Sequence, residues 1–317
     1  MKSFLSRRQF VREGGAVLAA AAVPAMTQQR DAGGKPARFR FGLNTGTLRG
    51  YKLALPEQIE AAAGAGYEGI EPWADDIDKF VEGGGSLADL KRRCRDLGLE
   101  VYNAIGFAQW IVEDDAARAK GLEQLKRDMS RVAELGGSRI AAPPAGATGP
   151  GSILDHTRMA ERYRTILELG RELGVVPQLE IWGMSANLGN LADALAVAAR
   201  AGHPDACILA DVFHLYKGGS APASLHLLGR SAAHVFHMND YPAVPDRAKV
   251  TDAQRIWPGD GVAPMAEILG YLVANDCRLF LSLELFNSEY WKLPVADCAR
   301  VGLEKMKAAV AAAGYEV

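Results

Sequence analysis

Short apolar runs alternate with amphipathic stretches from Arg38 to the end of the chain. The apolar runs have the length and composition of buried strands and predict strands at Phe39–Leu43, Gly69–Pro72, Val101–Ile105, Arg139–Ala142, Pro177–Ile181, Cys207–Asp211, His234–Met238 and Leu279–Glu284. The stretches between them favour one apolar face, as in Met159–Leu173, and predict helices at Pro56–Ala65, Leu87–Leu97, Ala116–Leu135, Thr157–Leu173, Leu191–Ala201, Ser224–Leu228, Pro264–Ala274 and Val295–Ala312. The repeating unit is therefore a strand, a loop and a helix.

Glycines stand between several predicted helices and the strands that follow, where helices commonly end in the left-handed conformation. They are Gly66, Gly98, Gly136, Gly174 and Gly202. Eight strand–helix units with apolar strands predict an α/β fold, a single-domain (β/α)₈ TIM barrel. An open doubly wound sheet would need a glycine-rich phosphate loop after the first strand, which Leu43–Thr47 does not supply.

The first 25 residues have the order of an export signal. Paired arginines, Arg7 and Arg8, precede a short apolar segment, and Val23–Ala25 fits a small-residue cleavage site. This order resembles a twin-arginine signal peptide, with a frayed N-terminal helix as the alternative. We expect residues 1–25 to be the signal, 26–37 a linker and 38–317 the catalytic barrel. The mature protein would then be periplasmic, without a membrane anchor.

The composition excludes a disordered, collagenous or coiled-coil protein. The chain has 317 residues, of which 49% are hydrophobic and 23% charged, with a formal net charge of −2. This is globular composition, and no dense basic stripe favours nucleic acid as a partner. A homo-oligomer is compatible with it. Four widely separated cysteines lack the spacing of a zinc site, and we expect buried free thiols rather than disulfides: Cys94, Cys207, Cys277 and Cys298.

Four consecutive predicted strands finish in a potential metal ligand. These ligands are Glu180, Asp211, His237 and Glu284. In a TIM barrel the C-terminal strand ends form the active site, and three carboxylates meeting there would repel one another without a cation. Taken singly, each glutamate could be a salt-bridge partner, and His234 is a rival for the histidine position. Together the four predict a divalent metal ion, with Mn²⁺ expected and Mg²⁺, Co²⁺ or Fe²⁺ as alternatives.

These strand ends also carry a family resemblance. Leu179-Glu180, Asp211-Val212-Phe213-His214, His237-Met238-Asn239-Asp240 and Leu283-Glu284 resemble the sugar isomerase/epimerase superfamily, which has the xylose-isomerase-like barrel. Pro258-Gly259-Asp260-Gly261 is similar to that family's loop after strand 7. The resemblance implies the same four metal ligands, and it implies that His214 and Arg255 contact substrate oxygens. The chain departs from the family at Asp240-Tyr241-Pro242, where members often have a basic residue, so a phosphate preference does not carry over.

Further substrate contacts are predicted from residue type and position. Trp182 and Trp110, with Trp73 and Phe107, lie at or just after predicted strand ends, where aromatic faces could stack on a sugar ring or simply pack in the core. Glu71, near the end of the second strand, could bind a substrate hydroxyl or form a loop salt bridge.

The predicted chemistry is proton abstraction beside a carbonyl, because two glutamates at one metal can remove and return a proton. We expect an isomerase or epimerase that acts through an enediolate on an unphosphorylated keto-sugar or related polyol, with Glu180 and Glu284 as catalytic residues. Alternatives are a metal-dependent lyase or dehydratase, acting by β-elimination on a 3-keto-glycoside or keto-polyol, and a non-catalytic periplasmic sugar-binding barrel. A nuclease is disfavoured because the strand ends offer too few histidines.

Overall fold

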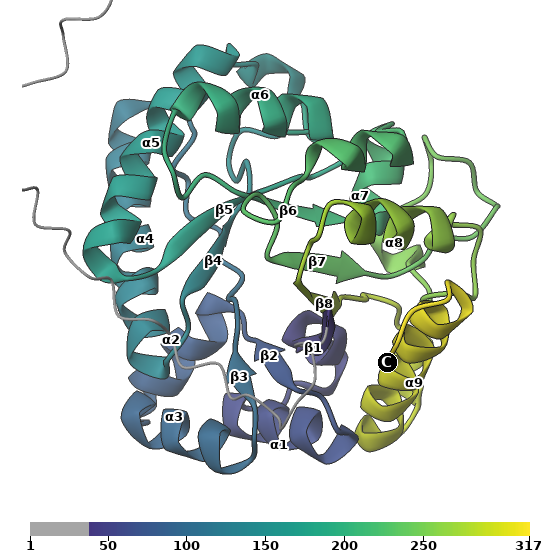
Figure 1. Ribbon diagram of the computed structural model, residues 1–317. Helices are drawn as coiled ribbons and strands as arrows, with labels where there is room; N and C mark the ends of the chain where they lie inside the picture. The colour runs from purple at the N-terminus through teal and green to yellow at the C-terminus, as the bar shows by residue number, and fades with distance from the viewer. Residues whose placement is uncertain (1–37) are drawn as a thin grey trace, which may run out of the picture. The chain divides into compact units, whose positions relative to one another are not determined.

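Eight parallel strands form a closed ring in the computed structural model, which describes residues 38–317 (Figure 1). The strands are β1 Phe39–Asn44, β2 Gly69–Glu71, β3 Glu100–Val101, β4 Arg139–Ala142, β5 Val176–Glu180, β6 Ile208–Asp211, β7 Val235–Met238 and β8 Leu279–Leu283. They pair in the order β3-β2-β1-β8-β7-β6-β5-β4. The ring closes beyond β3, where the Ala104 amide donates to the Arg139 carbonyl (3.1 Å) and the Ala141 amide donates to the Ala104 carbonyl (2.8 Å). The predicted TIM barrel is confirmed.

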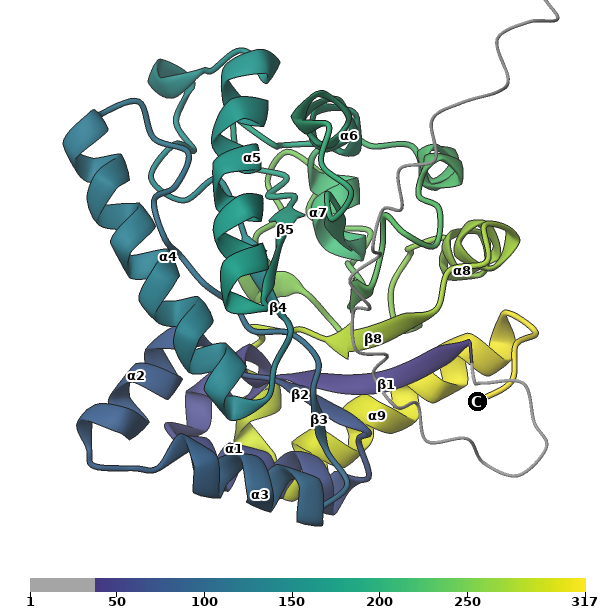
Figure 2. The ribbon, with the colours of Figure 1, turned by 60° about the vertical axis from the view of Figure 1, so that its left-hand side comes forward.

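Helices surround the ring on its outer side (Figure 1). They are α1 Leu55–Ala65, α2 Ala74–Glu82, α3 Leu87–Asp96, α4 Asp115–Leu135, α5 His156–Leu173, α6 Leu191–Ala201, α7 Val212–Lys217, α8 Met265–Ala274 and α9 Val295–Ala312. The last helix, α9, packs against α1, so the final and first strand–helix units are neighbours (Figure 2). This contact joins the two ends of the described chain into one ring of units.

The predicted elements agree with the structure except in a few places. The helices α2 and α7 were not predicted, and the predicted helix Ser224–Leu228 is a 3₁₀ helix, Pro222–Leu227. Strand β3 is shorter than the predicted Val101–Ile105, because Ile105 forms only an isolated bridge with Trp73. The five predicted helix-ending glycines all have positive φ, from 57° to 101°, as expected for left-handed C-caps.

A tyrosine fills the barrel interior beneath the site. The Tyr102 ring stacks on Phe280 with centroids 4.1 Å apart, and its hydroxyl donates to Ser282 Oγ (2.6 Å). Gly42 and Gly69 leave room for this ring, because a Cβ atom there would lie 2.3 Å and 2.6 Å from its carbon atoms. The small residues on β1 and β2 therefore let a polar ring cross the barrel below the ends of the strands.

The predicted signal peptide, residues 1–25, and the predicted linker, residues 26–37, lie outside the described residues. All four cysteines are buried and free, as expected. Within residues 38–317, no helix has both the length and the apolar character required to cross a bilayer.

Candidate metal centre

Three neighbouring strands bring their last polar side chains together at the C-terminal edge of the barrel. Asp211 ends β6, His237 lies in β7 and Glu284 follows β8, and each offers a ligand atom within 4.8 Å of the other two. The strand register explains this, because Asp211 is paired with His237 and His237 with Ser282. His237 Nδ1 lies 3.2 Å from Glu284 Oε2 and 3.7 Å from Asp211 Oδ2. We call these three residues the ligand cluster.

Glu180, the fourth predicted ligand, ends β5 beside this cluster. It does not belong to the set whose ligand atoms lie within 4.8 Å of one another among the described residues. Its carboxylate interacts electrostatically with His237 and Glu284, and burial raises the pKa of Glu180 to about 8. Its Oε2 atom is buried without a hydrogen-bond partner. Glu180 therefore presents an unsatisfied oxygen from the strand next to Asp211.

Arg255 enters the ligand cluster from the loop after β7. Its Nη1 donates to Asp211 Oδ2 (3.0 Å) and to Glu284 Oε2 (2.8 Å), while Nη2 lies 2.9 Å from His214 Nε2 and also pairs with Asp252. The residue is 1% exposed. Burial alone would lower the pKa of Arg255, but the surrounding carboxylates raise it above its usual value. The family resemblance implied that Arg255 contacts a substrate oxygen; in the structure its charge compensates two buried carboxylates.

Asp240 holds the loop that carries Arg255. Its carboxylate accepts hydrogen bonds from the amides of Gly259 (3.0 Å), Gly261 (3.1 Å) and Ala263 (2.9 Å). A Cβ atom on Gly261 would lie 2.3 Å from Asp240 Oδ1, so the close approach requires glycine. The Pro-Gly-Asp-Gly segment is thus fixed to Asp240 by hydrogen bonds from its backbone amides. An acidic side chain at position 240 supplies the oxygens that accept them.

Opposing charges set the protonation of the buried groups. Burial would raise the pKa of Glu284, but His237 and Arg255 outweigh burial and lower it to about 2. Burial would lower the pKa of His237, yet Glu71 and Glu284 raise it well above its ordinary value. Burial and Arg255 together lower the pKa of His214 to about 3.

The donors in this region fit a divalent cation. His237 Nδ1 and Glu180 Oε2 are both buried without a hydrogen-bond partner, although buried polar atoms are normally satisfied. Carboxylate oxygens and one imidazole nitrogen are ligands that Mn²⁺, Mg²⁺ and related ions accept. A cation among these atoms would satisfy both orphaned atoms and offset the negative charge of the carboxylates. Glu180, Asp211, His237 and Glu284 are therefore the residues that could hold it.

Comparison with known proteins identifies the family of this barrel. Residues 59–309 match the family described as the xylose isomerase-like TIM barrel, which is most of the chain. The chain belongs to this family. Among solved structures, this xylose isomerase-like chain is similar to the IOLI protein with a bound zinc atom (TM-score 0.80, 20% identity, 86% of this chain and 98% of that one). It is also similar to D-psicose 3-epimerase (TM-score 0.71, 19% identity, 87% and 99%). At such identities, structural likeness shows the fold alone.

Two curated relatives carry different activity names. The xylose isomerase-like chain is 28% identical to a 3-dehydroshikimate dehydratase of Pseudomonas aeruginosa over 260 residues, 80% of this chain and 39% of that protein. It is 24% identical to an inosose isomerase of Bacillus velezensis over 262 residues, 81% of this chain and 92% of that protein. The chain thus spans about two fifths of the length of the curated dehydratases that it matches.

Aromatic rings form a continuous arc beside the ligand cluster of this xylose isomerase-like barrel. Trp182 and Phe107 have ring centroids 6.1 Å apart, Phe107 and Trp73 are 4.9 Å apart, and Trp73 and Phe286 are 6.1 Å apart. All four side chains are partly exposed. The Trp182 side chain lowers the pKa of Glu180, although burial outweighs it, so this end of the arc lies beside Glu180. We refer to these four residues as the aromatic arc.

Other predicted site residues lie elsewhere in the barrel. Trp110 is in the core, where its Nε1 donates to the Pro143 carbonyl (2.9 Å), so its ring offers no exposed face to a substrate. His234 stands just before β7, outside the ligand cluster, and burial lowers its pKa to about 4. His214 is buried beside the cluster, where its Nδ1 accepts from the Gly183 amide (3.2 Å).

The carboxylate of Glu71, at the C-terminal end of β2, is fully buried and lies against His237. The amides that support the ligands were not predicted from the sequence. Asn44 Nδ2 donates to Glu71 Oε2 (2.7 Å) and Glu284 Oε1 (3.0 Å), and Asn239 Nδ2 donates to Asp211 Oδ2 (2.9 Å). The sequence contained a signal for these two residues, because both asparagines directly follow apolar residues at predicted strand ends.

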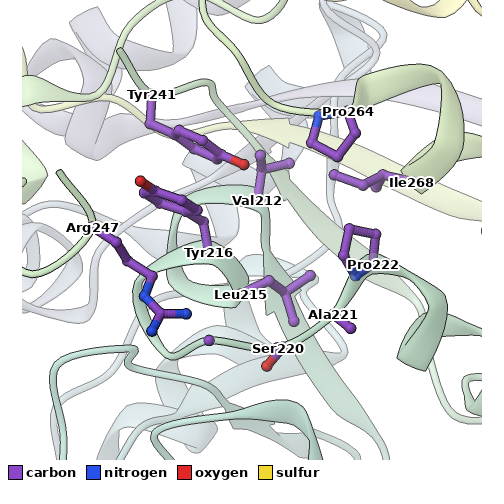
Figure 3. A pocket seen from close by; sticks show the side chains of 11 residues that line it. Val212, Leu215, Tyr216, Ser220, Ala221, Pro222, Tyr241, Arg247, Pro264 and Ile268 are labelled. Atoms are coloured by element: carbon purple, nitrogen blue, oxygen red, sulfur yellow. The ribbon is translucent and has the colours of Figure 1, made fainter. Parts of the chain in front are cut away.

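A separate pocket of about 240 Å³ lies between α7 and α8 (Figure 3). Tyr216 and Tyr241 line it with stacked rings 3.8 Å apart, and Arg247 stands at its edge. His214, on the same short helix as Tyr216, does not line this pocket but contacts Arg255. Helix α7 therefore separates the pocket from the ligand cluster.

Proposed function

We propose that this protein is a divalent-metal-dependent isomerase or epimerase that moves a proton beside the ketone of an unphosphorylated keto-sugar or related cyclic keto-polyol. The observation that carries the proposal is the convergence of Asp211, His237 and Glu284 within 4.8 Å, with Glu180 alongside and with two buried donor atoms lacking partners. Neither a core histidine nor a surface salt bridge explains such an arrangement.

Four side chains would hold the metal ion: Glu180, Asp211, His237 and Glu284. When bound, the ion supplies a Lewis acid that polarises the substrate ketone and stabilises the negative charge that develops on its oxygen. Metal analysis of the purified protein tests our expectation of Mn²⁺ against other divalent ions, including Zn²⁺.

The two glutamates would perform the proton transfers. Their strands lie on either side of β6 and β7 in the strand order, so Glu180 and Glu284 flank the other two ligands. One carboxylate removes the proton from the carbon beside the ketone, the C–H electron pair forms a carbon–carbon double bond, and the carbonyl electron pair moves onto the ketone oxygen to give an enediolate. Return of a proton to the opposite face of the same carbon re-forms the ketone and gives an epimer. Return of a proton to the former ketone carbon, with loss of the proton of the neighbouring hydroxyl, gives an isomer.

Three features support a cyclic, unphosphorylated substrate. The aromatic arc offers partly exposed ring faces beside Glu180, on which a ring could stack. Arg255 is already paired with Asp211, Glu284 and Asp252, so it has no spare charge for a phosphate. Inosose and 3-dehydroshikimate, named in the relatives, are both hydroxylated cyclic ketones.

Dehydration is the second candidate. It is favoured by the 28% identity to a 3-dehydroshikimate dehydratase, of which this chain covers 39%. The same proton abstraction would start the reaction. If a hydroxyl stands β to the ketone, the electron pair expels it, and the second glutamate supplies the proton that converts it to water.

Reaction in deuterated water separates these outcomes. Protein stripped with EDTA and reloaded with Mn²⁺ would be incubated with free ketohexoses, inosose and 3-dehydroshikimate, and the products followed by NMR. Deuterium in an unchanged carbon skeleton supports the isomerase or epimerase, and an unsaturated product supports the dehydratase. Metal-dependent sugar binding without any exchange would instead support a binding protein, and activity that survives complete metal removal would refute the proposal.

We further propose that the chain is exported to the periplasm through its paired arginines, Arg7 and Arg8. Replacing both with lysine should leave the uncleaved precursor in the cytoplasm, whereas the unaltered chain should appear shortened in the periplasmic fraction. Equal distribution of the two proteins would contradict export by this route.

A further inference from the structure

Glu71 is a buried carboxylate on which several donors converge. It ends β2 and is 0% exposed. Its Oε1 accepts from Asn103 Nδ2 (2.6 Å), and its Oε2 accepts from Asn44 Nδ2 (2.7 Å) and Ser282 Oγ (2.6 Å). His237 Nε2 lies 3.2 Å from Oε1 and 3.1 Å from Oε2. Four side chains from β1, β7, β8 and the segment after β3 therefore surround one carboxylate.

Glu71 meets this set of neighbours as an acceptor at both oxygens. A carboxylate can accept hydrogen bonds at both oxygens, whereas an amide in the same place would turn its NH₂ group toward a donor. Ser282 is itself committed, because its hydroxyl accepts a hydrogen bond from Tyr102 and so donates its own proton to Glu71. The environment therefore fits a glutamate at this position and does not fit a glutamine.

This carboxylate determines which nitrogen of His237 faces the ligand cluster. With Glu71 as an acceptor, His237 Nε2 must carry its hydrogen, and in a neutral imidazole Nδ1 then has the free lone pair. Nδ1 is the atom 3.2 Å from Glu284 Oε2, and it has no hydrogen-bond partner. Metal-binding histidines commonly donate their other ring N–H to a carboxylate, which fixes ring orientation and raises ligand basicity.

We infer that Glu71 is a positioning residue that holds His237 with Nδ1 directed at the metal. The inference rests on the proposed metal-dependent function and assigns Glu71 a role other than substrate binding. Asn44 connects Glu71 to a second ligand, because its side-chain amide donates to both Glu71 and Glu284. The buried network of Glu71 and Asn44 therefore contacts two of the ligands, His237 and Glu284.

The test compares E71Q with the matched control E68Q. Glu68 lies just before the same strand, is partly exposed and pairs with Arg40, which is not a predicted ligand. Titration of metal-free protein with Mn²⁺, followed by calorimetry, should show an affinity roughly 10–100-fold weaker for E71Q than for the unaltered chain. E68Q should bind as the unaltered chain does.

A second readout separates positioning from a general loss of structure. In Zn²⁺-loaded protein, ¹⁵N NMR should show His237 with a protonated Nε2 and a metal-shifted Nδ1, and E71Q should lose this single pattern while E68Q retains it. Circular dichroism monitors folding of each variant. If E71Q does not fold, E71D retains the charge but shortens the side chain, and it should also bind Mn²⁺ more weakly.

The outcomes distinguish the two proposals. An unaltered chain that binds no divalent metal would overturn both the proposed function and the role of Glu71. Metal binding in the unaltered chain, with equal affinity and an unchanged His237 spectrum in a folded E71Q or E71D, would overturn the role of Glu71 alone. Weaker binding with a changed His237 spectrum, and no change in E68Q, would support it.

Discussion

Replacing Arg255 with methionine tests whether a guanidinium and a metal ion compensate the same buried charges. The change removes a cation that lies 3.0 Å from Asp211 Oδ2 and 2.8 Å from Glu284 Oε2, and all three side chains are at most 5% exposed. Removing one partner of a buried ion pair typically costs about 3–5 kcal/mol, because the other charge is left without compensation. Asp252 adds little, since its side chain is 36% exposed.

This cost should appear in metal-free protein and shrink when metal is added. In EDTA, the loss corresponds to a fall in Tm of roughly 6–15 °C for a domain of this size. A divalent ion held by the same carboxylates supplies the missing positive charge and no longer faces repulsion from Arg255. Saturating Mn²⁺ should therefore raise the Tm of R255M more than that of the unaltered chain.

Thermal unfolding of the unaltered chain, R255M and R300M, each in EDTA and in Mn²⁺, measures both effects. Arg300 pairs with Asp297 and Glu304 on the exposed face of α9, so its loss should leave the Tm nearly unchanged with or without metal. An R255M variant as stable as the unaltered chain in EDTA would refute the charge argument. If Mn²⁺ raised the Tm of R255M and of the unaltered chain equally, the ion would not compensate the carboxylates that Arg255 pairs with.

Three further predictions concern other parts of the barrel. Glu180→Gln and Glu284→Gln should each lower kcat at least about 100-fold while circular dichroism stays unchanged, and full activity in either would exclude that residue from proton transfer. Trp182→Leu and Phe107→Leu should raise KM about 2–10-fold with a smaller change in kcat, and an unchanged KM in steady-state kinetics would argue against stacking. Burial raises the pKa of Asp128 to about 6, and the nearby Asp78 carboxylate adds to this effect. Protonation of Asp128 therefore stabilises the folded protein fully below the unfolded-state pKa of about 4, and this stabilisation is lost as pH rises through 6. Asp128→Asn should accordingly stabilise the protein by about 1–2 kcal/mol near pH 8, after allowance for solvent screening, with a smaller gain near pH 5, and an equal gain in urea unfolding at both pH values would contradict this.

Much of the fold was predictable because it depends on local pattern. Parallel strands buried on both faces are nearly continuous apolar runs, so a charged residue at the end of one stands out. That is why Glu180, Asp211, His237 and Glu284 could be proposed as a set before their distances were known. The helix ends were similarly visible, since glycine is favoured where a chain turns in the left-handed conformation.

The choice between similar residues required the tertiary structure. Trp110 and Trp182 both follow predicted strands, yet one packs in the core and the other lies at the mouth, because the path of each loop decides what its side chain meets. Arg255 reaches the cluster from a loop that Asp240 anchors just beyond it through three backbone amides.

The sequence by itself determined the barrel, the order of its units and the set of strand-end residues, because these follow from apolar periodicity and chain order. Only the tertiary structure decided that Glu71 contacts His237 and that Arg255 pairs with Asp211 and Glu284. The physical reason is that such contacts join residues far apart in the chain. Their geometry depends on strand register, loop anchoring and the burial of charge, none of which a local pattern records.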